Sequence, residues 1–185
     1  MPLVVALFSC ANDMDVVNKL IDTETEPDVV GNNVEILYSD SARLQMKMIT
    51  PLFIQYSSAT EPRDEFPEGL HVWFYEKTEE LKAEITANWA KHDYDTDLWE
   101  ARDNVVLTNA EGQILETEQL FWDTKEGIVY SEKYTKATFP NGTVADGDTF
   151  TATQDFSEYK FIKGKATIVL NEEENDLKDE ESNEN

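Results

Sequence analysis

The sequence of 185 residues contains a single cysteine, Cys10, and few basic residues. One cysteine excludes an intramolecular disulfide and the paired-cysteine spacing of zinc fingers. Only 15 Lys and Arg residues stand against 39 Asp and Glu residues, which gives a formal net charge of −24. Because nucleic acids bind basic surfaces, this balance argues against any nucleic-acid partner. Contact with an anionic lipid would have to use apolar side chains or a few local cations.

Motifs that carry catalytic chemistry are also missing. The chain has no nucleophile elbow, no glycine-rich phosphate loop and no HExxH zinc motif. The run HDYDTD at 92–97 spaces three aspartates like the first ligands of a calcium loop, but the required Gly and Glu do not follow. We therefore expect a polar hairpin turn there. The two histidines, His71 and His92, are expected at the surface, and the sequence predicts no metal site and no cofactor.

The central part of the chain has the periodicity of β-strands. Leu44, Met46 and Met48 alternate with polar residues, and a second alternation runs through 81–88. Period two over such lengths is typical of strands with one apolar face and one wet face. Glycine-containing turn signals separate these runs at 67–69, 111–112, 126–127 and 141–142. These features predict an all-β fold.

A weak internal repeat indicates how the strands are organised. Trp99, Tyr130 and Phe161 stand in similar contexts about 31 residues apart. Such a period marks stacked units of about three short strands that bury a common interior only together. The sequence thus predicts a twisted antiparallel β-jelly roll, a solenoid-like sandwich that is open at both ends.

The two ends of the chain differ from this centre. Residues 1–10 form a short apolar run that ends in Ser9-Cys10 and resembles the end of a signal peptide with a bacterial lipobox. Residues 11–32 are polar and acidic and are expected to be a tether. Residues 33–170 are expected to form the jelly roll. Residues 171–185 are rich in acids and nearly free of apolar residues, which predicts a disordered tail.

The stretch LETEQLFWDTKEGIVYSEK at 115–133 admits two interpretations. Glu116 and Glu118 lie roughly 7 Å apart on an ideal strand, which would suit a pair of glycosidase carboxylates. The same spacing occurs on any solvated strand face. The apolar parity changes between Thr117 and Leu120, and this change suggests a bulge that bends the strand around the roll.

Aromatic and methionine side chains are candidates to line an apolar ligand site. Each aromatic residue by itself is more typical of core packing, but together with Met46 and Met48 they would suit a sandwich that holds a flexible apolar ligand between its sheets. The aromatic residues concerned are Trp73, Trp89, Trp99, Trp122, Tyr130, Phe150 and Phe161.

The segment 104–133 carries a resemblance to a known family. Its order of strand, glycine turn, Leu115-x-Thr117, Leu120-x-Trp122-Asp123 and Tyr130-Ser131 resembles the repeat of the OstA-like lipopolysaccharide-transport proteins. The order of the units, the stretch DLWEARDNVV at 97–106 and the anchored N-terminus are most similar to the LptC branch of that family. The resemblance covers the strand region from 33 to 170.

The resemblance implies a periplasmic protein that is not an enzyme. It would accept lipopolysaccharide from an inner-membrane ABC transporter and pass it to an LptA-like bridge protein for outer-membrane assembly. A lipidated Cys10 would anchor it to the inner membrane. The alternatives are a soluble LptA-like bridge component and a periplasmic carbohydrate-active enzyme. The expected docking edge for the bridge protein is Thr167, Ile168 and Val169. The expected lipid-binding interior residues are Leu44, Met46, Met48, Ile85, Leu120, Trp122 and Phe150.

Overall fold

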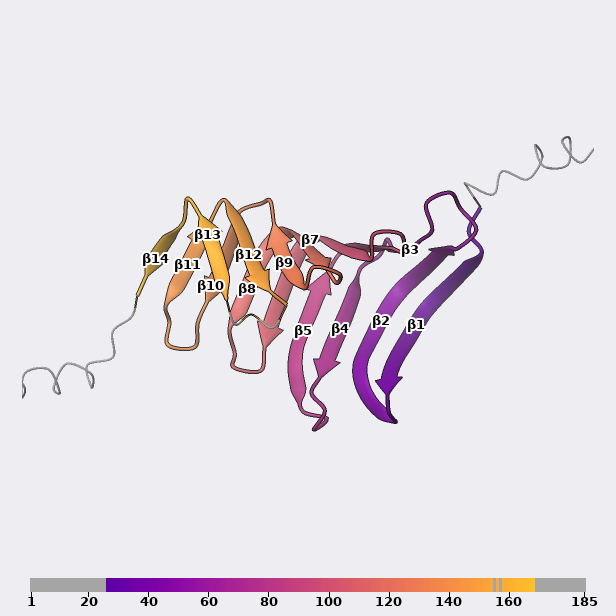
Figure 1. Cartoon of the computed structure of the whole chain (residues 1–185), viewed down its shortest axis with the longest axis horizontal. Coiled ribbons are helices and arrows are strands. Elements are labelled where there is room, and N and C mark those ends of the chain that lie inside the picture. Colours follow the sequence, from indigo (N-terminus) through magenta and orange to yellow (C-terminus); the bar gives the residue numbers. More distant parts are fainter. Residues whose placement is uncertain (1–25, 155, 157, 169–185) are drawn as a thin grey trace, which may run out of the picture.

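A computed structural model describes residues 26–154, 156 and 158–168, and within these ranges the chain forms fourteen β-strands and no helix. All strands pair antiparallel within one sheet (Figure 1), which confirms the predicted all-β fold. The strands are β1 (Val29–Asp40), β2 (Arg43–Tyr56), β3 (Arg63–Phe66), β4 (Leu70–Tyr75), β5 (Leu81–Ala87), β6 (Trp89–Asp93), β7 (Leu98–Asn109), β8 (Ile114–Asp123), β9 (Ile128–Ser131), β10 (Thr135–Thr138), β11 (Val144–Gly147), β12 (Thr149–Thr153), β13 (Tyr159–Ile162) and β14 (Lys165–Thr167).

The sheet folds over itself into two facing layers. Layer 1 contains β4, β5, β10, β11 and β14, and layer 2 contains β3, β6, β9, β12 and β13. The long strands β2, β7 and β8 belong to both, because one half of each pairs in layer 1 and the other half pairs in layer 2. This arrangement is a jelly roll.

The bends of the long strands form a continuous seam along one side of the roll. In β7, Asp103 and Asn104 adopt left-handed backbone conformations, with φ of 61° and 56°, and the pairing with β8 shifts register there. In β1, Asn33 is also left-handed, with φ of 51°, but the pairing with β2 keeps its register there. Asn and Asp tolerate this conformation better than most residues. The parity change predicted between Thr117 and Leu120 lies at this seam, but the extra residue is in β7.

Buried hydroxyl groups satisfy the interrupted backbone at the seam. Thr117 Oγ1 lies 3.0 Å from both Ser131 Oγ and the Tyr134 carbonyl oxygen, and 3.2 Å from Thr135 Oγ1. Thr50 Oγ1 lies 2.8 Å from the carbonyl oxygen of Gly69. A bulged strand leaves backbone groups that its neighbour does not pair, and threonine hydroxyls can supply the missing partners.

The core lies between the layers in two connected clusters. The first joins Ala87, Leu107, Leu115 and Ala137 of layer 1 to the facing side of layer 2, and the second centres on Met48, Phe66, Leu70, Val72 and Ala90. Three turn glycines predicted from the sequence, Gly112, Gly127 and Gly142, close hairpins with positive φ. Gly69, also with positive φ, instead stands at the seam where the chain passes from β3 to β4.

The roll is open at both ends, as Figure 1 shows. At one end β1 pairs only with β2, and at the other β13 pairs only with β12 and β14 only with β11, among the residues the structure describes. The first strand begins at Val29, so four residues assigned to the predicted tether, 29–32, belong to the sheet. The predictions for residues 1–10, most of the tether and the acidic tail lie outside the described residues.

In the segment 165–170, the consecutive apolar residues Ile168, Val169 and Leu170 would suit a strand covered on both faces. In the structure β14 is exposed along its whole length and Ile168, directly after it, is 67% exposed, whereas Val169 and Leu170 lie outside the described residues. β14 stands at the end of the roll, where β11 is its pairing partner on one side.

Candidate functional site

An apolar groove lies between the two layers, on the side opposite the seam. Its cavity volume is about 420 Å³. Layer 1 contributes β4 and β5, layer 2 contributes β6 and β9, and the bent strands β2, β7 and β8 contribute to both walls. The apolar side chains that line it are Met46, Met48, Leu70, Val72, Phe74, Ala83, Ile85, Ala90, Trp99, Ala101, Leu107, Ala110, Leu120, Phe121, Trp122, Val129 and Phe156.

Strand register explains how these residues come together. Met46, Phe74 and Ala83 are cross-strand partners on β2, β4 and β5, and Met48, Val72 and Ile85 form the next row toward the seam. On layer 2, Trp99, Trp122 and Val129 form the corresponding outer row. Alternation thus points all three rows into the groove.

The groove brings together five of the seven residues predicted for a lipid-binding interior, namely Met46, Met48, Ile85, Leu120 and Trp122. Phe150 is 2% exposed and lines a second, smaller cavity. Leu44 is half-buried on β2 and lines neither cavity.

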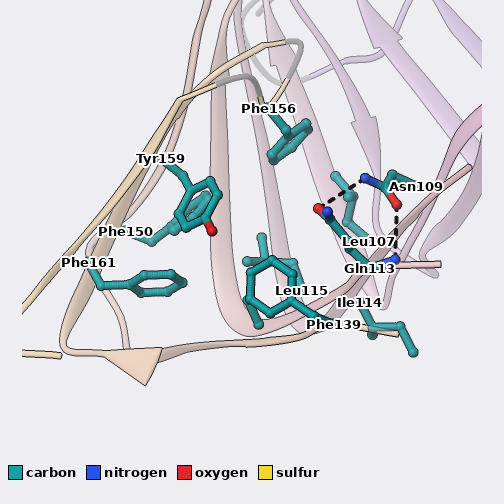
Figure 2. A pocket seen from close by; sticks show the side chains of 11 residues that line it. Leu107, Asn109, Gln113, Ile114, Leu115, Phe139, Phe150, Phe156, Tyr159 and Phe161 are labelled. Carbon is teal, nitrogen blue, oxygen red and sulfur yellow. Dashed lines mark hydrogen bonds between the residues drawn. The ribbon is translucent and has the colours of Figure 1, made fainter. Parts of the chain in front are cut away.

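The smaller cavity, about 30 Å³, lies toward the C-terminal end of the roll (Figure 2). It is walled mainly by aromatic rings, including Phe139, Phe150, Tyr159 and Phe161. Leu107, Asn109 and Phe156 line both cavities, so these three residues form the boundary between them.

Polar residues stand at the loop side of the groove. Lys82 Nζ lies 3.7 Å from Glu76 Oε1, and both side chains are about half exposed. Asn109 is held by Gln113: its amide nitrogen donates to Gln113 Oε1 at 3.1 Å, and its Oδ1 accepts from the Gln113 backbone N–H at 3.0 Å. Glu111 and Gln154 complete this side. The groove therefore has an apolar depth and a polar rim.

Two aromatic side chains meet across the groove. Phe74 of β4 and Trp122 of β8 approach edge to face, with ring centroids 5.9 Å apart and an interplanar angle of 89°. Such an arrangement is favourable for aromatic pairs. The contact connects layer 1 to layer 2 near the open side.

The HDYDTD segment forms the predicted polar turn, between β6 and β7. Asp93 Oδ1 accepts from the backbone N–H of Thr96 at 2.9 Å, and the Thr96 contacts hold the pKa of this carboxyl below its usual range. Asp97 accepts from the Thr124 hydroxyl and lies 2.8 Å from His92 Nε2, and these contacts lower its pKa. Within the described residues no cluster of three or more His, Cys, Asp or Glu has the arrangement of a metal site.

His92 is less exposed than the sequence suggested. Its ring stacks on Trp99 at 4.2 Å with an interplanar angle of 7°, and its side chain is 16% exposed. Because Trp99 lines the groove, the His92 ring that stacks on it supports this part of the groove wall.

Glu116 and Glu118, the two acids of the 115–133 stretch that suggested a glycosidase pair, face water. Glu116 forms an ion pair with Lys136 at 3.0 Å, and Glu118 stands exposed at the seam, where it accepts from the Asn104 backbone N–H at 3.4 Å. Neither lines the groove or the smaller cavity. The geometry gives the glycosidase alternative no concave site at these carboxylates.

Three residues of the site, Val72, Phe74 and Glu100, were not predicted from the sequence. Phe74 and Val72 line the groove, and their period-two spacing in the run HVWFY was the available signal. Glu100 is buried, held by Arg102 at 2.6 and 2.8 Å and by the Gln119 amide at 2.7 Å. No local pattern distinguishes it from the many exposed acids of the chain.

Three of the candidate aromatic residues lie outside both core clusters. Trp73 stacks on His71 at 3.6 Å, Trp89 lies 4.6 Å from the Arg102 guanidinium, and Tyr130 stacks on Phe121 at 4.9 Å. The adjacent residues Val72, Ala90 and Val129 point into the interior instead.

The remaining site predictions fall at the chain ends. Cys10 and Val169 lie outside the described residues, whereas Thr167 and Ile168 are at the exposed edge of the roll. In the part of the chain that the structure covers, no helix has the length and apolar character needed to span a membrane.

Comparison with known proteins adds the family. No curated protein matches the chain. A family model described as "Lipopolysaccharide-assembly, LptC-related" matches residues 3–157, a range that includes strands β1 to β12 and every residue lining the groove. The match spans well over half of the chain, and it agrees with the antiparallel jelly roll. The chain therefore belongs to the LptC-related family of lipopolysaccharide-assembly proteins.

Proposed function

We propose that this protein receives lipopolysaccharide from an inner-membrane ABC transporter and passes it to an LptA-like bridge protein. It belongs to a family of lipopolysaccharide transport components rather than enzymes. The observation that supports the lipid-carrying role most directly is the apolar groove of about 420 Å³ between the layers. Acyl chains would lie between the rows that start at Met46 and Trp99, with the polar part of the lipid at the rim.

Burial of apolar surface supplies the affinity in this proposal. Each buried CH₂ group contributes about 0.8 kcal/mol, so a few chain segments offset the cost of association. A groove that is open along one side allows the lipid to enter and leave sideways without unfolding the roll. Direction would come from ATP hydrolysis in the transporter.

The bridge protein would dock at the C-terminal end of the roll. β14 has an unpaired edge among the described residues, and exposed strand edges accept further strands. Thr167 and Ile168 belong to this edge, and Val169 would extend it. Anchoring through a lipidated Cys10 is proposed on the sequence pattern of residues 7–10 alone.

Narrowing the groove tests the lipid-carrying role. Met46→Trp and Ala83→Phe add bulk to the outer row of the groove wall, on β2 and β5, and we expect both to weaken lipopolysaccharide binding while circular dichroism stays that of the parent. Leu37→Trp adds similar bulk on the exposed face of β1, where Leu37 is 57% exposed, and should leave binding unchanged. Folded groove variants that bind lipopolysaccharide like the parent would contradict the proposal.

A further inference from the structure

The indole nitrogen of Trp122 is buried and has no hydrogen-bond partner among the described residues. Buried donors nearly always have an acceptor, so an orphaned one in a native fold calls for an explanation. No other buried side-chain nitrogen or oxygen in the described part of the chain lacks a partner. The exception is therefore specific to one side chain of the groove.

Trp122 occupies a transitional position in the groove. The deeper residue on the same strand, Leu120, is 4% exposed, and two residues beyond Trp122 the strand gives way to the turn at Thr124. Trp122 pairs in register with Trp99 and Val129, and all three line the groove. Across the groove, Phe74 contacts the ring. Trp122 thus stands in the outer row of the groove wall, between the apolar depth at Leu120 and the turn where the strand ends.

The charged groups of the rim do not indicate an anionic ligand as the partner of the Trp122 N–H. Lys82 is already paired with Glu76, and Glu111 adds a second carboxylate. The buried Glu100 also lines the groove and is held by Arg102 and Gln119. Two carboxylates and one ammonium group give no net attraction for an anionic head group. The ligand group that would complement the groove at Trp122 is therefore a neutral hydrogen-bond acceptor.

We propose that the Trp122 N–H donates a hydrogen bond to the carbonyl oxygen at the head of an acyl chain, in an ester or an amide. This inference rests on the proposed lipid-carrying function and adds a selectivity to it. The groove distinguishes acyl amphiphiles from alkyl chains of the same length that lack a carbonyl. An acyl chain has its carbonyl where its apolar part ends, which matches the place of Trp122 between depth and rim.

Comparing two ligands in the parent protein and in a variant tests the proposed hydrogen bond from Trp122. The probes are a dodecanoyl ester and a dodecyl ether of the same sugar, titrated calorimetrically below their micelle concentrations. The parent protein should bind the ester roughly threefold to tenfold more tightly than the ether, the range of one net hydrogen bond. Trp122→Phe keeps an aromatic ring and removes the donor, so it should abolish this preference.

Trp99→Phe is the matched control, because Trp99 lines the same groove beside Trp122. It should weaken both probes by the same factor and keep the preference for the ester. An equal loss of both probes in Trp122→Phe, or no preference in the parent protein, would overturn the inference while leaving the lipid-binding function intact. Failure of the parent to bind either probe or lipopolysaccharide itself would overturn the proposed function as well.

A spectroscopic measurement on the parent protein makes the test independent of any variant's folding. With a ¹³C-labelled ester carbonyl, binding should shift the carbonyl stretch to lower frequency than in a dry apolar solvent, as hydrogen bonding requires. An unshifted band in the bound state would show a carbonyl without a donor and contradict the proposal.

Discussion

At the scale of single residues, polar contacts in this acidic chain are concentrated where the backbone leaves its regular path. Asp28 precedes the first strand and binds the loop after β2: its Oδ2 accepts from the backbone N–H of Ser57 at 2.6 Å and of Ser58 at 2.9 Å. The hydroxyl and backbone groups of Ser58 and Ser57 lower the pKa of Asp28 to about 2. Asp28 thus connects the segment before β1 to the loop after β2.

Asp28 should therefore give a pH-dependent contribution to stability. Its pKa is lower in the folded protein, so the contribution is complete above about pH 4 and is lost as the pH falls toward about 2. Asp28→Ala should lower the melting temperature at pH 5, and the difference from the parent should shrink as the pH approaches 2. Glu26→Ala, which removes an exposed charge two residues earlier, is the control. A difference that stays constant with pH would contradict this assignment.

The hydroxyl network at the seam should carry measurable stability. Thr117→Val keeps the shape of the side chain but leaves the Tyr134 carbonyl and the Ser131 hydroxyl without this partner. We expect a loss of about 1–3 kcal/mol in the free energy of unfolding. Thr86→Val, on β5 away from this network, should change stability by less than half as much. Equal effects in chemical denaturation would show that the network contributes little.

Little of this residue-level detail was predictable from the sequence. The parity change between Thr117 and Leu120 indicates a bend, but the hydrogen bonds of Thr117 depend on neighbours that are fourteen and seventeen residues away. The same holds for Glu100, whose burial depends on Gln119 of the adjacent strand. Contacts between strands determine these roles, and a local pattern does not contain them.

At the scale of strands, alternation and turn glycines predicted the elements well. The outward and inward faces of β8 follow the sequence, with Leu115, Thr117 and Leu120 buried and Glu116 and Glu118 exposed. The repeat was recognised but placed one residue out of register. Ala90, Leu120 and Phe150 recur at intervals of thirty and face the interior in each unit. The match of Trp99 with Tyr130 was wrong, because Trp99 points into the interior and Tyr130 lies on the opposite face of the sheet.

The C-terminal edge provides a prediction at this scale. Successive backbone N–H groups of a strand point to opposite sides, so one of Thr167 and Ile168 directs its N–H away from β11. Of Thr167→Pro and Ile168→Pro, the variant that removes this outward donor should lose binding to the LptA-like bridge protein in a pull-down. Its melting temperature should remain close to that of the parent, because β14 is exposed and short.

The other edge strand of this end supplies the control. Ile162→Pro in β13, which is 48% exposed, alters the edge of layer 2. We expect it to leave bridge binding in place. Undiminished binding by both Thr167→Pro and Ile168→Pro, with loss in Ile162→Pro, would move the docking edge to layer 2.

At the scale of the whole molecule, the fold class followed from the sequence and the groove did not. The apolar faces of β2, β5 and β8 were predictable, and they do face the interior. How far apart two such faces stand depends on the seam, where the long strands pass from one layer to the other, in β7 through the left-handed residues Asp103 and Asn104. A filled core and an open groove use the same alternation.

The measurement that tests the central claim most directly is photocrosslinking to lipopolysaccharide. A photoreactive phenylalanine analogue at Met46 would stand in the groove wall, and the same analogue at Leu37 would stand on the exposed face of the neighbouring strand β1. We predict a lipopolysaccharide adduct from position 46 and none from position 37. Adducts from neither position, or from position 37 alone, would contradict a lipid path between the two layers.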